Sequence, residues 1–137
     1  MALIRHGARP SEQSAIRFFR QVTVDLDGVR QRMGERWEPF LAYSLDRART
    51  ASVQLANRRL LRELGLPQIP PEQLARITVP TTLIWGRHDR VMPLRTAQEA
   101  SARHGWPLRV IDHAGHFSVA DQPAAFLAPL RVAIDNR

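Results

Sequence analysis

The sequence predicts an α/β fold in which a helical first half precedes a β-α-β-α unit with two parallel strands. Two short apolar segments, 81–85 and 108–111, are rich in residues that favour strands. A helical pattern over 94–104 separates them. Strands that alternate with helices in this way form parallel pairs joined by a crossover helix.

The first half, residues 1–70, is predicted to be helical. Ser11 and Asp27 are candidate caps of two short helices, and Pro39 is predicted to end the second. The apolar residues from about Leu41 to Leu64 predict a third, longer helix. Gly65 is predicted to end this helix, and the extended linker Gln68-Ile69-Pro70-Pro71 follows, which places the boundary of this region at residue 70.

The second half, residues 71–137, contains the two predicted strands. Gly105 is predicted to end the helix between them. Asp121 is a candidate cap for a last helix, with Pro123 in its first turn. Pro129 lies within that helix and is predicted to kink it or start it afresh.

Two polar side chains follow the predicted strands at matching positions. Asp89 comes shortly after the turn at Gly86, and His116 comes shortly after segment 108–111. Because parallel strands end at one edge of a sheet, we expect both side chains on a common rim. A carboxylate that accepts the Nδ1 proton of a histidine fixes its tautomer and stabilises the imidazolium, which suits a general base. His88 and His113 flank this rim and are predicted to be bystanders.

These residues resemble the C-terminal end of the α/β-hydrolase fold. The resemblance is carried by Ile84-Trp85-Gly86-Arg87-His88-Asp89 with Pro93, by Ala114-Gly115-His116-Phe117, and by Asp121-Gln122-Pro123. It covers residues 77–130, and it implies that 71–137 is the C-terminal βαβα portion of the core. Residues 1–70 then correspond, by position and helicity, to the family's helical lid.

The resemblance also implies roles for single residues. Asp89 would be the acid of a catalytic triad and His116 its base, with Val91 and Phe117 lining the site for a small hydrophobic substrate. The implied reaction is hydrolysis of an ester or of a carbon–carbon bond, and no cofactor or metal is implied. The four groups His88, Asp89, His113 and His116 match no known metal-ligand spacing.

The nucleophile of the family is missing from the sequence. It lies in a G-x-S-x-G elbow, and none of the six serines has that glycine framing. The sequence therefore predicts a partial fold, the lid and last two strands, that carries no nucleophile and is inactive alone. It would be a truncated reading frame, a piece cut from a longer protein, or a chain that associates with a separate first half.

A second hypothesis is a non-catalytic remnant that self-associates or binds a partner chain. Two parallel strands leave ladder groups unpaired at their outer edges, and parallel sheets are normally covered on both faces. A homodimer or a partner chain at the exposed sheet edge would cover these groups. Alternatively, the helical half would fold over the strands.

The composition excludes several other classes of protein. A length of 137 residues and a hydrophobic content of 44% are typical of one globular domain. Without cysteine, disulfides and thiolate metal sites are excluded. No apolar run approaches the roughly 20 residues of a membrane helix, so the prediction is a cytoplasmic protein without a membrane partner. The net charge of +7 comes from arginines mixed with acids, and no aromatic interleaves the cluster at 58–62, so nucleic-acid binding is not predicted.

Overall fold

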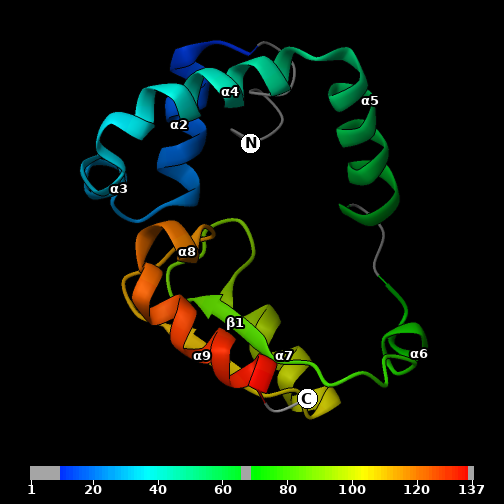
Figure 1. The fold of residues 1–137 in the computed structure, drawn as a ribbon. Helices are drawn as coiled ribbons and strands as arrows, with labels where there is room; N and C mark the ends of the chain where they lie inside the picture. Colours follow the sequence, from blue (N-terminus) through cyan, green and yellow to red (C-terminus); the bar gives the residue numbers. More distant parts are fainter. Residues whose placement is uncertain (1–9, 66–68, 136–137) are drawn as a thin grey trace. The chain divides into compact units, whose positions relative to one another are not determined.

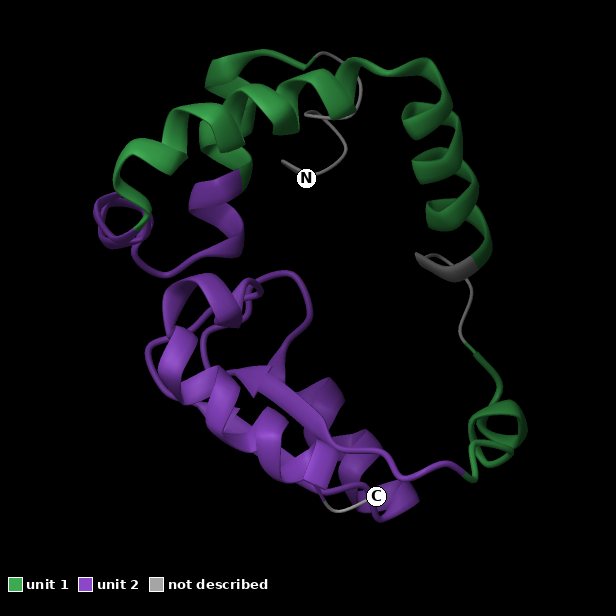
Figure 2. Cartoon of the chain, in the orientation of Figure 1, with its two compact units in different colours: residues 1–18, 33–78 green, residues 19–32, 79–137 purple. Residues whose placement is uncertain are grey.

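The structure, a computed structural model, describes residues 10–65 and 69–135. These residues belong to two compact units, coloured separately in Figure 2. One unit comprises residues 1–18 and 33–78, and the other comprises 19–32 and 79–137. Residues 19–32 therefore belong with the strands, although they are far from them in the sequence.

The first half is helical, as predicted (Figure 1). Its elements are α2 (Glu12–Val22), α3 (Leu26–Met33), the 3₁₀ turn η1 (Gly34–Arg36), α4 (Trp37–Arg49), α5 (Ala51–Leu60) and the π-helical turn η2 (Leu61–Gly65). At the start of α2, the Ser14 amide donates to the Ser11 hydroxyl at 3.2 Å, which is the capping contact expected of Ser11. Gln68, the first residue of the predicted linker, lies outside the described residues.

Three details of the first half differ from the prediction. Pro39 does not end a helix but lies in the first turn of α4, where its missing N–H costs no hydrogen bond. The cap of α3 is Asp25, whose carboxylate accepts from the Gly28 amide at 2.9 Å, and not Asp27. The long helix over 41–64 is broken at Thr50, whose φ of −68° and ψ of 121° are extended. The Thr50 carbonyl then accepts the bond at 3.0 Å from Gln54 that opens α5.

The second half confirms the predicted β-α-β-α order. Its elements are the short helix α6 (Pro71–Leu74), β1 (Leu83–Gly86), α7 (Leu94–His104), β2 (Leu108–Ile111), the short helix α8 (Ser118–Asp121), which the sequence did not predict, and α9 (Pro123–Asp135). The two strands are parallel, with the pairs Leu83–Leu108, Ile84–Arg109, Trp85–Val110 and Gly86–Ile111. In Figure 1, α9 lies in front of β1 and α7 lies behind it, and both helices contact both strands. In the described part of the chain the sheet has these two strands.

The helix boundaries of the second half follow the predicted turn chemistry except at Asp121. Gly105 has a φ of 68°, the left-handed conformation that ends α7. Asp121 does not cap the last helix but is the final residue of α8. The carbonyl of Gln122 instead accepts from Phe126 at 2.9 Å to open α9. That helix then runs through Pro129 without starting afresh.

The core of the second unit joins the strand region to residues 19–32. Its buried apolar side chains are Phe19, Val22, Leu26, Val29, Ala97, Ile111 and Ala114. Close packing of these side chains fixes where the backbone of residues 19–32 meets the loops that follow the strands. Among the described residues, no helix combines the length and the apolar character that a membrane crossing requires.

Candidate active site

Two loops follow the strands, the acid loop (87–93) after β1 and the histidine loop (112–117) after β2. The Arg87 amide of the acid loop donates to the carbonyl of Ile111, the last residue of β2, and the His88 amide donates to the Ala114 carbonyl of the histidine loop, both at 2.9 Å. Gly86 allows this close approach. A Cβ there would lie 2.1 Å from the carbonyl oxygen of Gly115, a distance that real side chains do not adopt.

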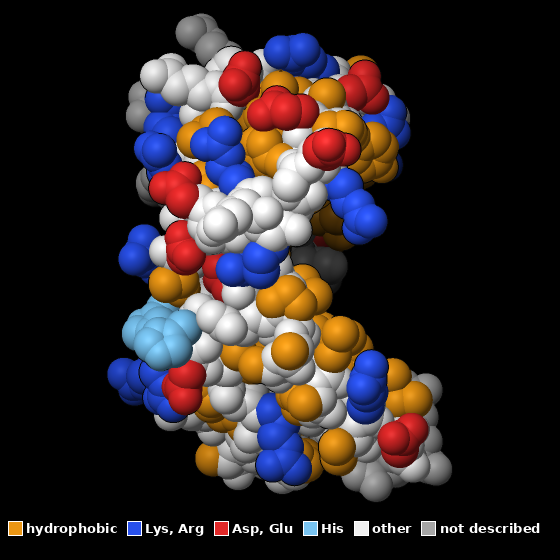
Figure 3. All heavy atoms as spheres, turned by 60° about the vertical axis from the view of Figure 1, so that its left-hand side comes forward, with side chains coloured by type: hydrophobic (Ala, Val, Ile, Leu, Met, Phe, Trp, Pro, Cys, Tyr) orange, Lys and Arg blue, Asp and Glu red, His pale blue; other side chains and the backbone are white. Residues whose placement is uncertain are grey.

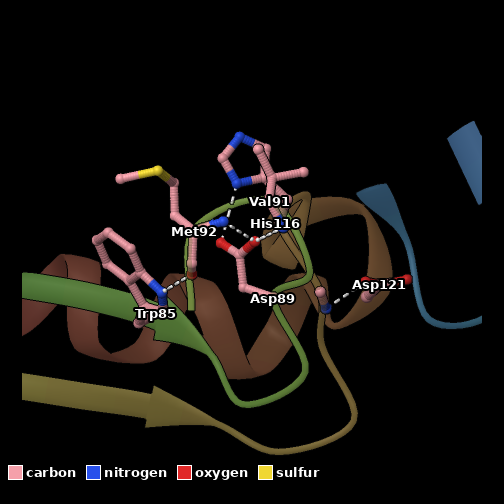
Figure 4. A network of polar contacts seen from close by, with 7 residues as sticks. Trp85, Asp89, Val91, Met92, His116 and Asp121 are labelled. Atoms are coloured by element: carbon pink, nitrogen blue, oxygen red, sulfur yellow. Dashed lines mark hydrogen bonds and ion pairs between the residues drawn. The ribbon is translucent and has the colours of Figure 1, made fainter. Parts of the chain in front are cut away.

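The acid loop holds Asp89 by contacts within its own few residues. One carboxylate oxygen, Oδ1, accepts from the amides of Val91 and Met92, each at 2.8 Å. The indole of Trp85 donates to the Met92 carbonyl at 2.9 Å and closes the loop against the strand (Figure 4). The Asp89 side chain is only 5% exposed.

The other oxygen of Asp89 contacts the histidine loop. Its Oδ2 lies 2.9 Å from His116 Nδ1, as Figure 4 shows. With the proton on Nδ1, the histidine donates to the carboxylate and its Nε2 keeps a lone pair that can accept a proton. The His116 side chain is 34% exposed, so reactants can reach it. The expectation that the two strand ends bring this acid and this histidine together is confirmed, and their catalytic roles stay predictions.

The two predicted substrate-lining residues flank this contact. Val91 is half-buried and follows Asp89 in the acid loop. Phe117 is half-buried, and its ring stacks on the His116 imidazole with centroids 6.1 Å apart. The structure therefore brings both residues next to the Asp–His pair, and their contact with a substrate remains a prediction.

The histidine loop is held by residues that the sequence did not suggest. The Gly115 amide donates to Asp121 Oδ2 at 2.8 Å, and the Phe117 amide donates to the Val22 carbonyl at 2.8 Å. Asp121 is 3% exposed, and it also accepts from the Val24 amide at 3.1 Å. The sequence indicated only a helix cap at Asp121, because its position before Pro123 suits that role equally well.

Charged groups surround the outer side of the site. Arg87 donates to the carboxylate of Asp112, and this hydrogen bond, with the positive charge of the guanidinium, lowers the pKa of that exposed carboxyl. His88, His113 and His116 are all exposed, and Figure 3 shows histidine atoms at the surface beside arginine and acidic side chains. Within 10–65 and 69–135, no group of three or more His, Asp or Glu side chains is arranged to hold a metal ion.

Comparison with known proteins identifies the family of this fold. The sequence model of the Alpha/beta hydrolase family matches residues 2–129. A relative at 30% identity over 86 residues is the 2-hydroxy-6-oxo-6-(2'-aminophenyl)hexa-2,4-dienoic acid hydrolase of Metapseudomonas resinovorans. The match covers 61% of this chain and 29% of the relative, so the chain spans well under half of that protein. No solved structure matches the chain.

The match spans both the helical first half and the β-α-β-α unit, and it confirms the predicted partial α/β-hydrolase fold. The chain belongs to the Alpha/beta hydrolase family.

Proposed function

We propose that this chain supplies the acid and the general base of a hydrolase. The 2.9 Å contact between His116 Nδ1 and Asp89 Oδ2, at the ends of two parallel strands in a chain of this family, is the observation that carries the proposal. Because Asp89 accepts the Nδ1 proton, His116 Nε2 is the nitrogen that acts on the reactants.

In the proposed reaction, a serine hydroxyl attacks the carbonyl carbon of the substrate. His116 Nε2 takes the hydroxyl proton, and Asp89 stabilises the imidazolium that forms. The imidazolium then protonates the leaving group, and the neutral imidazole activates the water that releases the product. The sequence contains no G-x-S-x-G elbow, so the serine would come from a further segment of the fold, on a longer chain or on a separate one.

The proposed substrate is small and hydrophobic and carries a carbonyl group. The relative's name describes a dienoic acid with an oxo group next to an aminophenyl ring, so that compound has a carbonyl group beside an apolar ring, together with a polar carboxyl group. Val91 and Phe117 are apolar neighbours of the Asp–His pair and would line one side of the bound substrate. Both an ester and the carbon–carbon bond beside a ketone are reactive groups for this chemistry.

The test requires the chain together with a nucleophile-bearing segment. The segments to be tried are any protein encoded directly upstream and the part of the Metapseudomonas relative outside the match, which covers 29% of that protein. We expect a p-nitrophenyl ester or the dienoic acid to be hydrolysed, with kcat lowered about 10³-fold or more in His116→Ala. His88→Ala is the matched control, an exposed histidine of the same rim, and should leave kcat unchanged. If the His116→Ala protein hydrolyses the substrate as fast as the unmodified protein, the proposal is wrong.

A non-catalytic, self-associating chain is the second candidate. It is supported by the two-stranded sheet of the described residues and by exposed apolar side chains on α9, namely Leu127, Val132 and Ile134. A dimer by light scattering, together with no turnover in any combination with a nucleophile segment, would favour this candidate.

A further inference from the structure

We propose that Asp121 is a positioning residue for His116, and that it ties the histidine loop to the backbone of residues 22–24. The inference rests on the proposed function only in treating His116 as the base. Asp121 does not touch the imidazole, so it would act through the backbone on either side of it.

The carboxylate of Asp121 is buried and accepts two backbone N–H groups. Oδ2 accepts from the Gly115 amide at 2.8 Å, and both oxygens lie 3.1 Å from the Val24 amide. Hydrogen bonds from backbone amides to a carboxylate are roughly twice as strong as those to a neutral acceptor. One side chain therefore joins two backbone positions that are 91 residues apart, from 24 to 115.

A second contact holds the other side of the histidine. The Phe117 amide donates to the Val22 carbonyl at 2.8 Å. A Cβ at Gly115 would lie 2.9 Å from that same carbonyl oxygen, so the loop passes close to the end of α2 and leaves no room for a side chain. The residues before and after His116 are thus both bonded to 22–24, directly or through Asp121.

The groups that bond to the Asp121 side chain are N–H donors, so this position requires a side chain with two accepting oxygens. Arg32 donates to the main-chain carbonyls of Ala120 and Asp121, each at 3.0 Å, and not to the carboxylate. In the described residues, the recorded hydrogen bonds to the Asp121 carboxylate all come from backbone N–H groups. An asparagine has the same shape but presents an NH₂ group, and this group would face one of those donors.

The test uses the full chain labelled with ¹⁵N and observes His116 by NMR. In Asp121→Asn we expect the His116 Nδ1–H signal to shift or disappear and the Gly115 amide to exchange about tenfold faster or more. Arg32→Gln is the matched control, because it removes bonds to the same segment and leaves the carboxylate in place. It should leave both signals unchanged. Asp121→Glu keeps the charge and should restore part of the Gly115 protection.

Two results would overturn the proposal. One is an unchanged His116 signal in a folded Asp121→Asn chain. The other is loss of the whole fold, by circular dichroism, in both Asp121 variants, because Asp121 would then serve global stability alone. Hydrolysis is measured separately. If the His116 signal depends on Asp121 but turnover does not need His116, the positioning role holds and the proposed function fails.

Discussion

The acid loop and the histidine loop lie side by side and share the Asp89–His116 contact, yet the side chains that hold them in place come from different parts of the chain. The acid loop is held locally, since Asp89 accepts from amides two and three residues ahead and Trp85 donates seven residues along the chain. The histidine loop is held by Asp121 and by Val22, and the bond from Val24 to Asp121 spans 97 residues. The acid side of the pair is therefore set by local sequence, and the base side by tertiary contacts.

Because of this difference, we expect substitutions in the acid loop and substitutions in residues 19–32 to have different effects on the Asp–His pair. A change inside the acid loop alters the position of the carboxylate and little else. A change in residues 19–32, which precede the strands by more than fifty residues, reaches the imidazole through the backbone.

The largest expected effect is that of Asp89→Asn on catalysis. An asparagine keeps the shape but cannot accept the Nδ1 proton in the same way, so the histidine loses its tautomer. In the active assembly we expect kcat to fall by about 10⁴-fold with the fold intact. Asp112→Asn, an exposed carboxyl on the outer side of the site, is the control. A loss below about tenfold would show that Asp89 is not the acid of the triad.

The next largest effect is on stability and concerns Gly86, where the backbone of the histidine loop passes closest. In Gly86→Ala the new Cβ would lie 2.1 Å from the Gly115 carbonyl oxygen, so the two loops must separate. We expect the free energy of unfolding to fall by about 3 kcal/mol in urea titrations. Gly105→Ala is the comparison, because φ is 68° there but no atom lies within 4 Å of the new Cβ. It should cost only about 1 kcal/mol. Equal effects would mean that the loops do not touch at Gly86.

A smaller effect is expected when the acid loop alone is loosened. Trp85→Phe removes the indole N–H that donates to the Met92 carbonyl and keeps an aromatic ring. We expect a loss of about 0.5–1 kcal/mol and faster exchange of the Val91 and Met92 amides. The amides of Gly115 and Phe117 should be unaffected. If they exchange faster as well, the two loops are not independent.

The smallest effect concerns the Arg87–Asp112 pair. The pKa of Asp112 is lowered in the folded chain, so the pair stabilises the fold above the unfolded-state pKa, and this contribution is lost as the pH falls through the lower, folded-state value. That window lies below about pH 4. In Arg87→Gln we expect the Asp112 carboxyl to titrate at a higher pH, as followed by ¹³C NMR. Solvent screening of this exposed pair keeps the change in stability slight. An unchanged titration would contradict the contact.

The sequence was sufficient for the parts of this fold that depend on local pattern. The strand over 108–111 has the predicted bounds, and the first strand is shifted by one or two residues, to Leu83–Gly86. The contact between Asp89 and His116 followed from two strand ends and the rule for parallel sheets. Gly105 ends α7 because glycine readily adopts the left-handed conformation found there, and the residue type alone indicates this.

The remaining features were set by contacts that no local pattern contains. The break at Thr50 was missed because its hydroxyl can equally donate to the Asp46 carbonyl within a continuous helix, as it does here at 2.9 Å. Asp121 was assigned to the helix that follows it, whereas its carboxylate bonds to Gly115 and Val24. An acid before a helix that begins with proline can cap that helix or accept amides from distant segments. The packing of residues 19–32 decides between these two roles.

The end of α2 also matters to anyone who would exchange the helices of this protein for those of another. At positions 22 and 24 the bonding groups are a carbonyl and an amide, which nearly every residue type provides. The exposed side chain at 24 can vary without breaking its bond, except that proline there removes the donor, whereas the fully buried Val22 must keep its packing. A graft designed by matching residue types would overlook this junction. A successful one must reproduce the path of the main chain through 22–24.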